Sequence, residues 1–156
     1  MLCSLVIIST AAAAGGLKEG PEAVEKWFEK LTYAKEKLTK LHFYFYDTCS
    51  RRSFKRGPEP ESKIMGRAQG IYGSDSLEEL GILMILNLAF TDVKYNGSTL
   101  SVLGHNPFLH EYREMPIVGG SSVFRLARGI ATAQTVWYNL TTNNAVVEYT
   151  IMVLHY

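Results

Sequence analysis

Residues 95–129 constrain the fold more than any other part of this 156-residue chain. Asn96 and Gly97 form a strong tight-turn pair, because both residue types tolerate a positive φ angle. Polar or small residues then alternate with apolar ones over residues 99–104, as they do in a half-buried β-strand. Residues 118–120, which include two glycines, predict a second chain reversal. The stretch therefore predicts antiparallel strands joined by short turns.

The strand expected after the second reversal carries a cation on its apolar face. Phe124 and Leu126 share that face, and Arg128 follows at the same spacing. An arginine in such a position is rarely buried without a function or a partner. Asp47 is a candidate partner, and a buried pair that only satisfies both charges would explain the pattern without any activity.

Aromatic and β-branched runs predict four further strands, at residues 41–47, 65–74, 130–138 and 145–156. Residues 81–92 are apolar over a length that also suits a buried helix. Repeated strands with short polar turns predict an antiparallel meander or barrel.

The N-terminal forty residues have a different composition. Residues 1–16 are an apolar run followed by small residues, which is typical of a signal peptide, although no positively charged segment precedes it. A buried or disordered tail is the alternative. Residues 17–40 place Trp27 and Leu31 at helical spacing among glutamates and lysines and predict one amphipathic helix. Residues 41–156 then form a single β domain.

Composition excludes several classes of function. A formal net charge of +1 gives no electrostatic case for binding nucleic acid. Cys3 and Cys49 make neither a disulfide framework nor a metal site, and the four histidines lack metal-ligand spacing. Beyond the N-terminus no stretch is apolar for long enough to cross a membrane. We therefore expect no metal, no cofactor and no membrane or nucleic-acid partner.

Several motifs in order resemble the dirigent family of secreted plant proteins over residues 41–156. They include residues 41–47, 66–70 and 146–149. The resemblance implies an eight-stranded antiparallel β-barrel related to allene oxide cyclase. On that basis residues 81–92 are expected to form a strand rather than a helix.

The chain departs from the family pattern after Asp47. Family members carry a long segment there, with a second and a third strand, whereas here the basic residues 48–56 lead directly to Gly57 and Pro58. We therefore expect a barrel that lacks two strands, with an open edge along residues 41–47 that a partner chain would cover. A splicing or gene-model artefact is the alternative to a real shortening.

The resemblance also implies a pocket with aromatic walls for phenolic small molecules. In that pocket a cation would hydrogen-bond a phenoxy or quinone-methide oxygen, and a carboxylate would exchange a proton. Tyr46 stands where the family usually has a histidine. The expected catalytic residues are Asp47, Glu114 and Arg128, and the expected substrate-binding residues are Tyr44, Tyr72 and Phe124.

Three functions are compatible with the resemblance. The first is stereoselective coupling of phenoxy radicals, for example from coniferyl alcohol in lignan biosynthesis, with a separate laccase or peroxidase as radical source. The second is a cyclase or dehydratase that forms pterocarpans through a quinone methide. The third is a defence-related phenolic-binding protein without turnover. The family also implies a homodimer or homotrimer in the apoplast, and glycosylation triplets begin at Asn96 and Asn139.

Overall fold

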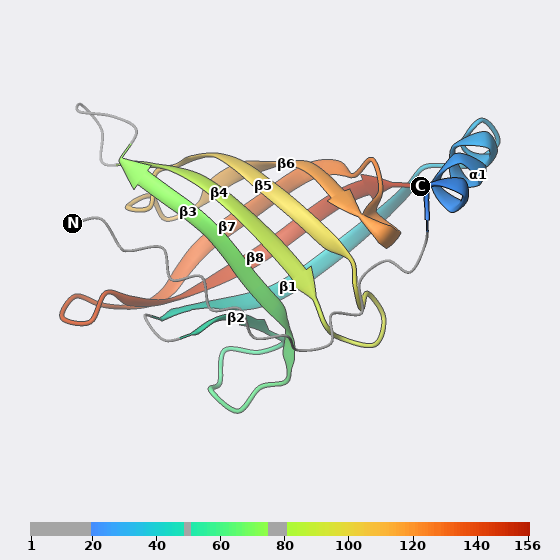
Figure 1. The fold of residues 1–156 in the computed structure, drawn as a ribbon. Coiled ribbons are helices and arrows are strands. Elements are labelled where there is room, and N and C mark those ends of the chain that lie inside the picture. Colours follow the sequence, from blue (N-terminus) through green and yellow to red (C-terminus); the bar gives the residue numbers. More distant parts are fainter. Residues whose placement is uncertain (1–19, 49–50, 75–80) are drawn as a thin grey trace.

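The computed structural model describes residues 20–48, 51–74 and 81–156. The predicted signal peptide, residues 1–16, lies outside these described residues. These described residues form one helix and eight strands, which can be followed along the sequence in Figure 1. They are α1 (Pro21–Leu31), β1 (Lys37–Thr48), β2 (Arg51–Lys55), β3 (Ile64–Ser74), β4 (Ile82–Phe90), β5 (Thr99–Asn106), β6 (Arg113–Ser121), the 3-10 turn η1 (Ser122–Phe124), β7 (Arg128–Asn139) and β8 (Asn144–His155).

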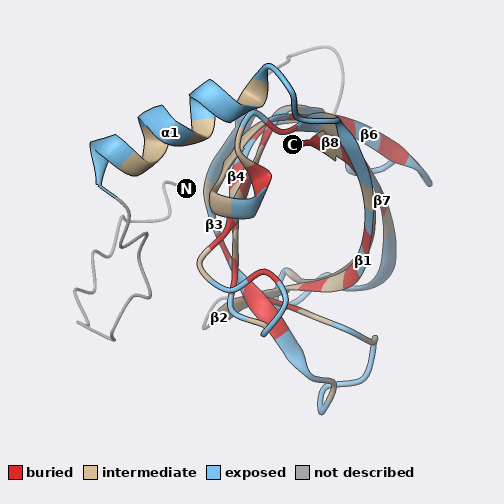
Figure 2. Ribbon diagram, turned by 90° about the vertical axis from the view of Figure 1, so that its right-hand side faces the viewer, coloured by how far each residue is buried: buried red, intermediate tan, exposed pale blue. Residues whose placement is uncertain are grey.

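The eight strands form a closed antiparallel barrel in sequence order. Closure comes from β8, which pairs with β1 from Lys37 opposite His155 to Asp47 opposite Ala145. Figure 2 looks towards the end of the barrel beside α1 and shows the strands around a common interior. The predicted barrel is confirmed. Its β4 is a strand rather than a helix, because its residues alternate between buried and more exposed positions.

Aromatic side chains fill the barrel interior. Phe43 packs against Phe54 with ring centroids 4.6 Å apart, and Phe54 contacts Phe90 at 5.2 Å. Phe90 in turn lies 5.5 Å from Phe124. All four side chains are fully buried. The many aromatic residues of this chain therefore form much of its core.

Strand β2 corrects the expectation that two strands are missing. Its five residues pair with β1 on one side and with β3 on the other, so no strand is absent from the closed barrel. Arg52 and Phe54 point inwards, opposite Asp47 and Phe45 of β1. The basic composition of this segment concealed an alternating pattern with one fully buried phenylalanine as its anchor.

The short β2 leaves part of each neighbouring strand paired on one side. It pairs with β3 only at Ile64, Gly66 and Arg67. Within the described residues, β3 beyond Arg67 is paired with β4 but not with β2. Residues 37–43 of β1 likewise pair with β8 and not with β2. The predicted open edge of β1 is therefore present for residues 41–43 and filled for residues 44–47.

The two turn predictions have different outcomes. Gly97 has a φ angle of 80° in the turn between β4 and β5, which confirms the first reversal. The second reversal is wrong, because Gly119 and Gly120 lie inside β6. A Cβ atom at Gly120 would lie 2.6 Å from the carbonyl oxygens of Thr99 and Phe124, so this glycine permits a close backbone approach. The chain turns instead at η1.

The N-terminal helix is shorter than predicted. It ends at Leu31, and residues 37–40 begin β1. Trp27 lies beside the guanidinium of Arg125, at 5.3 Å from the ring centroid, and no residue of α1 is buried. Nowhere in the described ranges does a helix have the length and apolar character needed to span a bilayer.

Candidate functional site at the barrel mouth

Strand β1 ends on the side of the barrel opposite α1 (Figure 1), and Asp47 is its second-last residue. Leu41, Phe43 and Phe45 are the buried residues of β1, and Asp47 continues their alternation. Its side chain is only 26% exposed, and its direct cross-strand neighbour is Arg52 of β2. An inward carboxylate near an aromatic core needs a partner.

Arg52 and Tyr72 are the hydrogen-bond partners of this carboxylate. Arg52 Nε donates to Asp47 Oδ1 at 3.0 Å, and the Tyr72 hydroxyl lies 3.4 Å from Oδ2. Arg52 also reaches the Tyr72 hydroxyl at 2.9 Å, and its guanidinium lies 5.1 Å from the ring centroid. The three side chains thus form one hydrogen-bonded group across β1, β2 and β3.

A second polar pair lies deeper in the same end. Arg113 of β6 is 4% exposed and donates through Nη1 to the Phe108 carbonyl at 3.0 Å and to Thr135 Oγ1 at 2.7 Å. Among the residues that the structure describes, neither its buried Nε nor the buried Asn106 Oδ1 has a hydrogen-bond partner. Burial lowers the pKa of Arg113. Unsatisfied polar atoms facing the interior of a barrel are suited to hydrogen-bond a ligand.

Tyr149 lies between the two groups. Burial raises the pKa of Tyr149 to about 12, with a smaller opposing effect of Arg113 and a smaller raising effect of Asp47. Its hydroxyl therefore remains a neutral hydrogen-bond donor throughout the physiological range. We call the six residues Asp47, Arg52, Tyr72, Asn106, Arg113 and Tyr149 the mouth cluster. It brings a carboxylate, two phenolic hydroxyls and two cations to the same end of the barrel.

Two of the predicted catalytic residues are outside the mouth cluster. Glu114 is exposed on the outer face, because alternation along β6 turns its neighbours Arg113 and Met115 inwards. Arg128 is 62% exposed and pairs with Glu36 at 2.7 Å. The expectation that it shares an inner face with Phe124 is wrong, because η1 and the positive φ angle of Leu126 interrupt the strand.

The predicted substrate-binding residues are spread over three places. Tyr72 belongs to the mouth cluster. Tyr44 lies on the outer face, where its hydroxyl donates to Glu148 beside His42. Phe124 is fully buried near the opposite end of the barrel, against Phe90.

Four residues of the mouth cluster have no counterpart among the predicted site residues, namely Arg52, Asn106, Arg113 and Tyr149. Arg52 was assigned to a segment that did not look like a strand, although its alternation with Phe54 could have indicated an inward side chain. The sequence prediction names Glu114 as a catalytic residue but not its neighbour Arg113. Alternation from the buried Met115 and Ile117 would have identified it.

One predicted glycosylation site lies in a turn and the other at the end of a strand. Asn96 is exposed between β4 and β5. Asn139 ends β7, and its side-chain oxygen accepts hydrogen bonds from the backbone N–H groups of Thr141 and Thr142.

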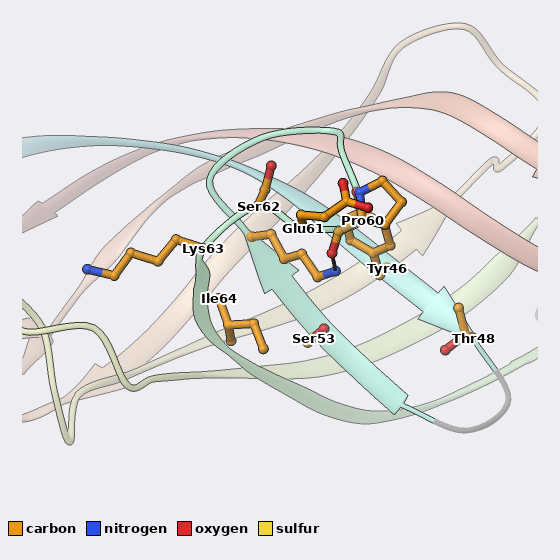
Figure 3. Close-up of a pocket in the computed structure, with 9 residues that line it drawn as sticks. Tyr46, Thr48, Ser53, Pro60, Glu61, Ser62, Lys63 and Ile64 are labelled. Carbon is orange, nitrogen blue, oxygen red and sulfur yellow. Dashed lines mark hydrogen bonds between the residues drawn. The ribbon is translucent and has the colours of Figure 1, made fainter.

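A separate groove of about 520 Å³ lies on the outer face of the β1–β2 hairpin (Figure 3). Tyr46, Ser53 and Lys55 line it, together with residues 60–64. The Tyr46 hydroxyl donates to the Pro58 carbonyl, and Lys55 Nζ donates to that of Pro60 at 2.6 Å. These bonds fasten the 56–63 loop against the hairpin. The groove is therefore on the reverse side of the strands that carry the mouth cluster.

The part of the chain that the structure describes contains no group of three or more histidine, cysteine, aspartate or glutamate side chains placed to hold a metal ion. The chemistry that the mouth cluster offers is proton exchange and hydrogen bonding.

Comparisons with known proteins agree on one family. The family described as Dirigent-like protein matches residues 52–154. Dirigent protein 23 of Arabidopsis thaliana is 35% identical over 184 aligned positions, which cover 99% of this chain and 95% of the relative. This chain has 156 residues, so at least 28 of those positions have no counterpart in it.

A pterocarpan synthase sequence and a solved pterocarpan synthase structure are also similar to this chain. Pterocarpan synthase 1 of Glycyrrhiza echinata is 40% identical, over 81% of this chain and 82% of the relative. The solved structure of the pterocarpan synthase dirigent protein GePTS1 superposes with a TM-score of 0.74 at 39% identity. It covers 79% of this chain and 87% of that chain.

Proposed function

Because the chain belongs to the dirigent-like protein family, we propose that its barrel mouth binds a phenolic small molecule and closes a ring in it through a quinone methide. The observation that carries this proposal is the Asp47 carboxylate, held between Arg52 and the Tyr72 hydroxyl at the mouth of an aromatic barrel. The similarity to pterocarpan synthases supports the reaction class.

The proposed reaction loses one molecule of water. Asp47 takes the proton of a phenolic hydroxyl, and the electron pair released expels a benzylic hydroxyl group, which leaves as water with a proton from Tyr72. The resulting quinone methide is attacked at carbon by a second hydroxyl of the same molecule, which forms the ring C–O bond. The proton of that hydroxyl returns to Tyr72, and the proton on Asp47 returns to the phenol oxygen.

A second candidate function is stereoselective coupling of two phenoxy radicals, as in lignan biosynthesis. Its support is the pair of cations Arg52 and Arg113, which are placed to orient phenolic oxygens without any proton transfer. A separate laccase or peroxidase would supply the radicals. The two functions need different assays, because only the coupling reaction requires an oxidant.

The test is to incubate the protein with an isoflavanol, and separately with coniferyl alcohol plus a laccase, and to analyse products on a chiral column. We expect a pterocarpan from the first mixture without oxidant. Asp47→Asn should lower its rate by about 100-fold, because the proton acceptor is lost. An enantio-enriched product from the second mixture alone would support the coupling function instead. Binding of either phenolic compound without formation of either product would support a phenolic-binding protein without turnover.

Glu114 and Arg128, both on the outside of the barrel, provide matched controls. Glu114→Gln and Arg128→Gln neutralise one charge each, as Asp47→Asn does, but neither side chain reaches the mouth cluster. Both variants should retain wild-type turnover. Loss of activity in either one would contradict the assignment of the site to the mouth cluster.

We further propose that the protein is a secreted apoplastic homodimer or homotrimer. A row of outward apolar residues runs across the barrel, with Ile71 paired to Ile85 and Ile85 to Leu103. Ile130 and Met152 continue it beyond β6. Strands β4 and β5 contain no acidic residue, lysine or arginine. An uncharged face suits self-association, since symmetric contacts bring identical residues together.

A further inference from the structure

We infer that Arg52 is a positioning residue that holds Asp47 and Tyr72 in register for the reaction, in place of backbone pairing that the short β2 does not supply. The inference deepens the proposed function and rests on it. It concerns a residue from the basic segment in which this chain departs from the family pattern.

The first support is the number of groups that one guanidinium connects. Nε donates to Asp47 Oδ1 at 3.0 Å, Nη2 donates to the Tyr72 hydroxyl at 2.9 Å, and Nη1 reaches the Gly70 carbonyl at 3.4 Å. The guanidinium side chain therefore joins β1 and β3 from its place on β2. Guanidinium has a planar fork of donors, which fixes direction as well as distance.

The second support is the position of the Gly70 carbonyl. Gly70 lies on the part of β3 that pairs with β4 but, among the described residues, not with β2. Tyr72 lies further along the same unpaired edge. The Arg52 side chain thus makes the contact with this edge that backbone hydrogen bonds make along a longer strand. The direct hydrogen bond between the Tyr72 hydroxyl and Asp47 is longer, at 3.4 Å.

The third support is how Arg52 itself is held. The opposite face of β2 carries Ser53 and Lys55, which lie under the 56–63 loop, and Lys55 donates to the Pro60 carbonyl. Phe54 anchors the same strand in the core. Because the strand is fixed on both faces, Arg52 can impose its geometry on Asp47 and Tyr72.

The test compares turnover of wild type, Arg52→Ala and Arg52→Lys with and without guanidinium ion in the buffer. We expect Arg52→Ala to lower kcat by about 100-fold, with KM changed by less than about threefold, because misplacement of reacting groups acts on the chemical step. Added guanidinium should raise the kcat of Arg52→Ala by roughly tenfold. Arg52→Lys should remain impaired, since an ammonium lacks the fork.

Arg56→Ala is the matched control, because Arg56 belongs to the same basic segment and is exposed. It should retain wild-type kcat and show no response to guanidinium. In the ligand-free protein, the Arg52 Nε–H resonance should be protected from exchange with water and should lose that protection in Asp47→Asn.

Wild-type kcat in Arg52→Ala would contradict this inference alone. A loss that guanidinium does not relieve, accompanied by a lower melting temperature, would show a purely structural role and would also contradict it. Absence of any product from wild-type protein with both substrate classes would contradict the proposed function and this inference with it.

Discussion

At the scale of single residues, the mouth cluster holds its charges in two ways. Asp47 is partly exposed and neutralised by Arg52, whereas Arg113 is buried and held by a carbonyl and a hydroxyl. Burial lowers the pKa of Arg113 and raises that of Tyr149. Arg113 and Tyr149 thus bring a cation and an uncharged hydroxyl to this end of the barrel. Both groups are suited to hydrogen-bond an oxygen of a ligand.

The raised pKa of Tyr149 predicts how stability changes in alkali. Its pKa is about 12 in the folded protein and about 10.0 by its ordinary value. Its contribution is therefore fully present below pH 10, and it is lost as the pH rises from 10 to 12, because only the unfolded tyrosine ionises there. Urea unfolding should show a loss of roughly 2–3 kcal/mol that Tyr149→Phe lacks. Equal pH dependence of both proteins would contradict the burial of this hydroxyl.

The two glycosylation triplets give a second prediction at this scale. Secreted from a plant host, the protein should carry glycan at Asn96 or Asn139, because Asn96 lies in an exposed turn and Asn139 ends β7 at the turn into β8. Enzymatic removal of glycans should lower the mass measured by mass spectrometry. Asn96→Gln and Asn139→Gln together should abolish the shift. An unmodified secreted protein would contradict this prediction.

At the scale of elements, strand β2 shows where sequence patterns predict the fold and where they do not. Strand β3, predicted at residues 65–74, is observed at Ile64–Ser74, whereas β1 begins four residues before its predicted start at residue 41. Strand β2 was missed because five residues with three cations resemble a loop, and only the burial of Phe54 reveals its role. Arg128 lies outside, against expectation, and Arg113 lies inside, because local alternation and the turn at η1 decide which face a side chain occupies.

Phe54 provides the element-scale prediction. Its ring is fully buried between Phe43 and Phe90, so Phe54→Ala should lower the free energy of unfolding by about 3–5 kcal/mol. Phe28→Ala is the control, because Phe28 of α1 is 50% exposed, and it should change the free energy by less than about 1 kcal/mol. Chemical denaturation measures both. A cost for Phe54→Ala no larger than the control would mean that β2 is not anchored in the core.

At the scale of the whole molecule, the two ends of the barrel differ: one is filled by packed aromatic rings, and the other carries the polar mouth cluster. Phe90 and Phe124 close the end near α1, whereas the mouth cluster lies at the other end. The outer apolar row crosses the side wall, from Ile71, which neighbours Tyr72 in the chain, to Met152 of β8. Association through this row would leave each mouth open to its own ligand.

This arrangement predicts that the loss of self-association does not abolish turnover. Ile85→Asp places a charge in the middle of the outer apolar row and should convert the oligomer to monomer in light scattering, because a buried unpaired charge is costly. Lys94→Asp, on an exposed loop, is the control and should leave the mass unchanged. Turnover per chain should persist in the monomer. An oligomer that survives Ile85→Asp would place the interface elsewhere.

The five-residue β2 has a consequence for how such barrels can diversify. Closure of the barrel requires a strand at this position, but it does not require that strand to be as long as its neighbours. The aromatic packing that involves Phe54 is satisfied within those five residues. The remaining length of the strand is therefore free to change at the rim without disturbing the core. In evolutionary terms, a deletion at this strand changes the rim of the barrel mouth and preserves the aromatic core.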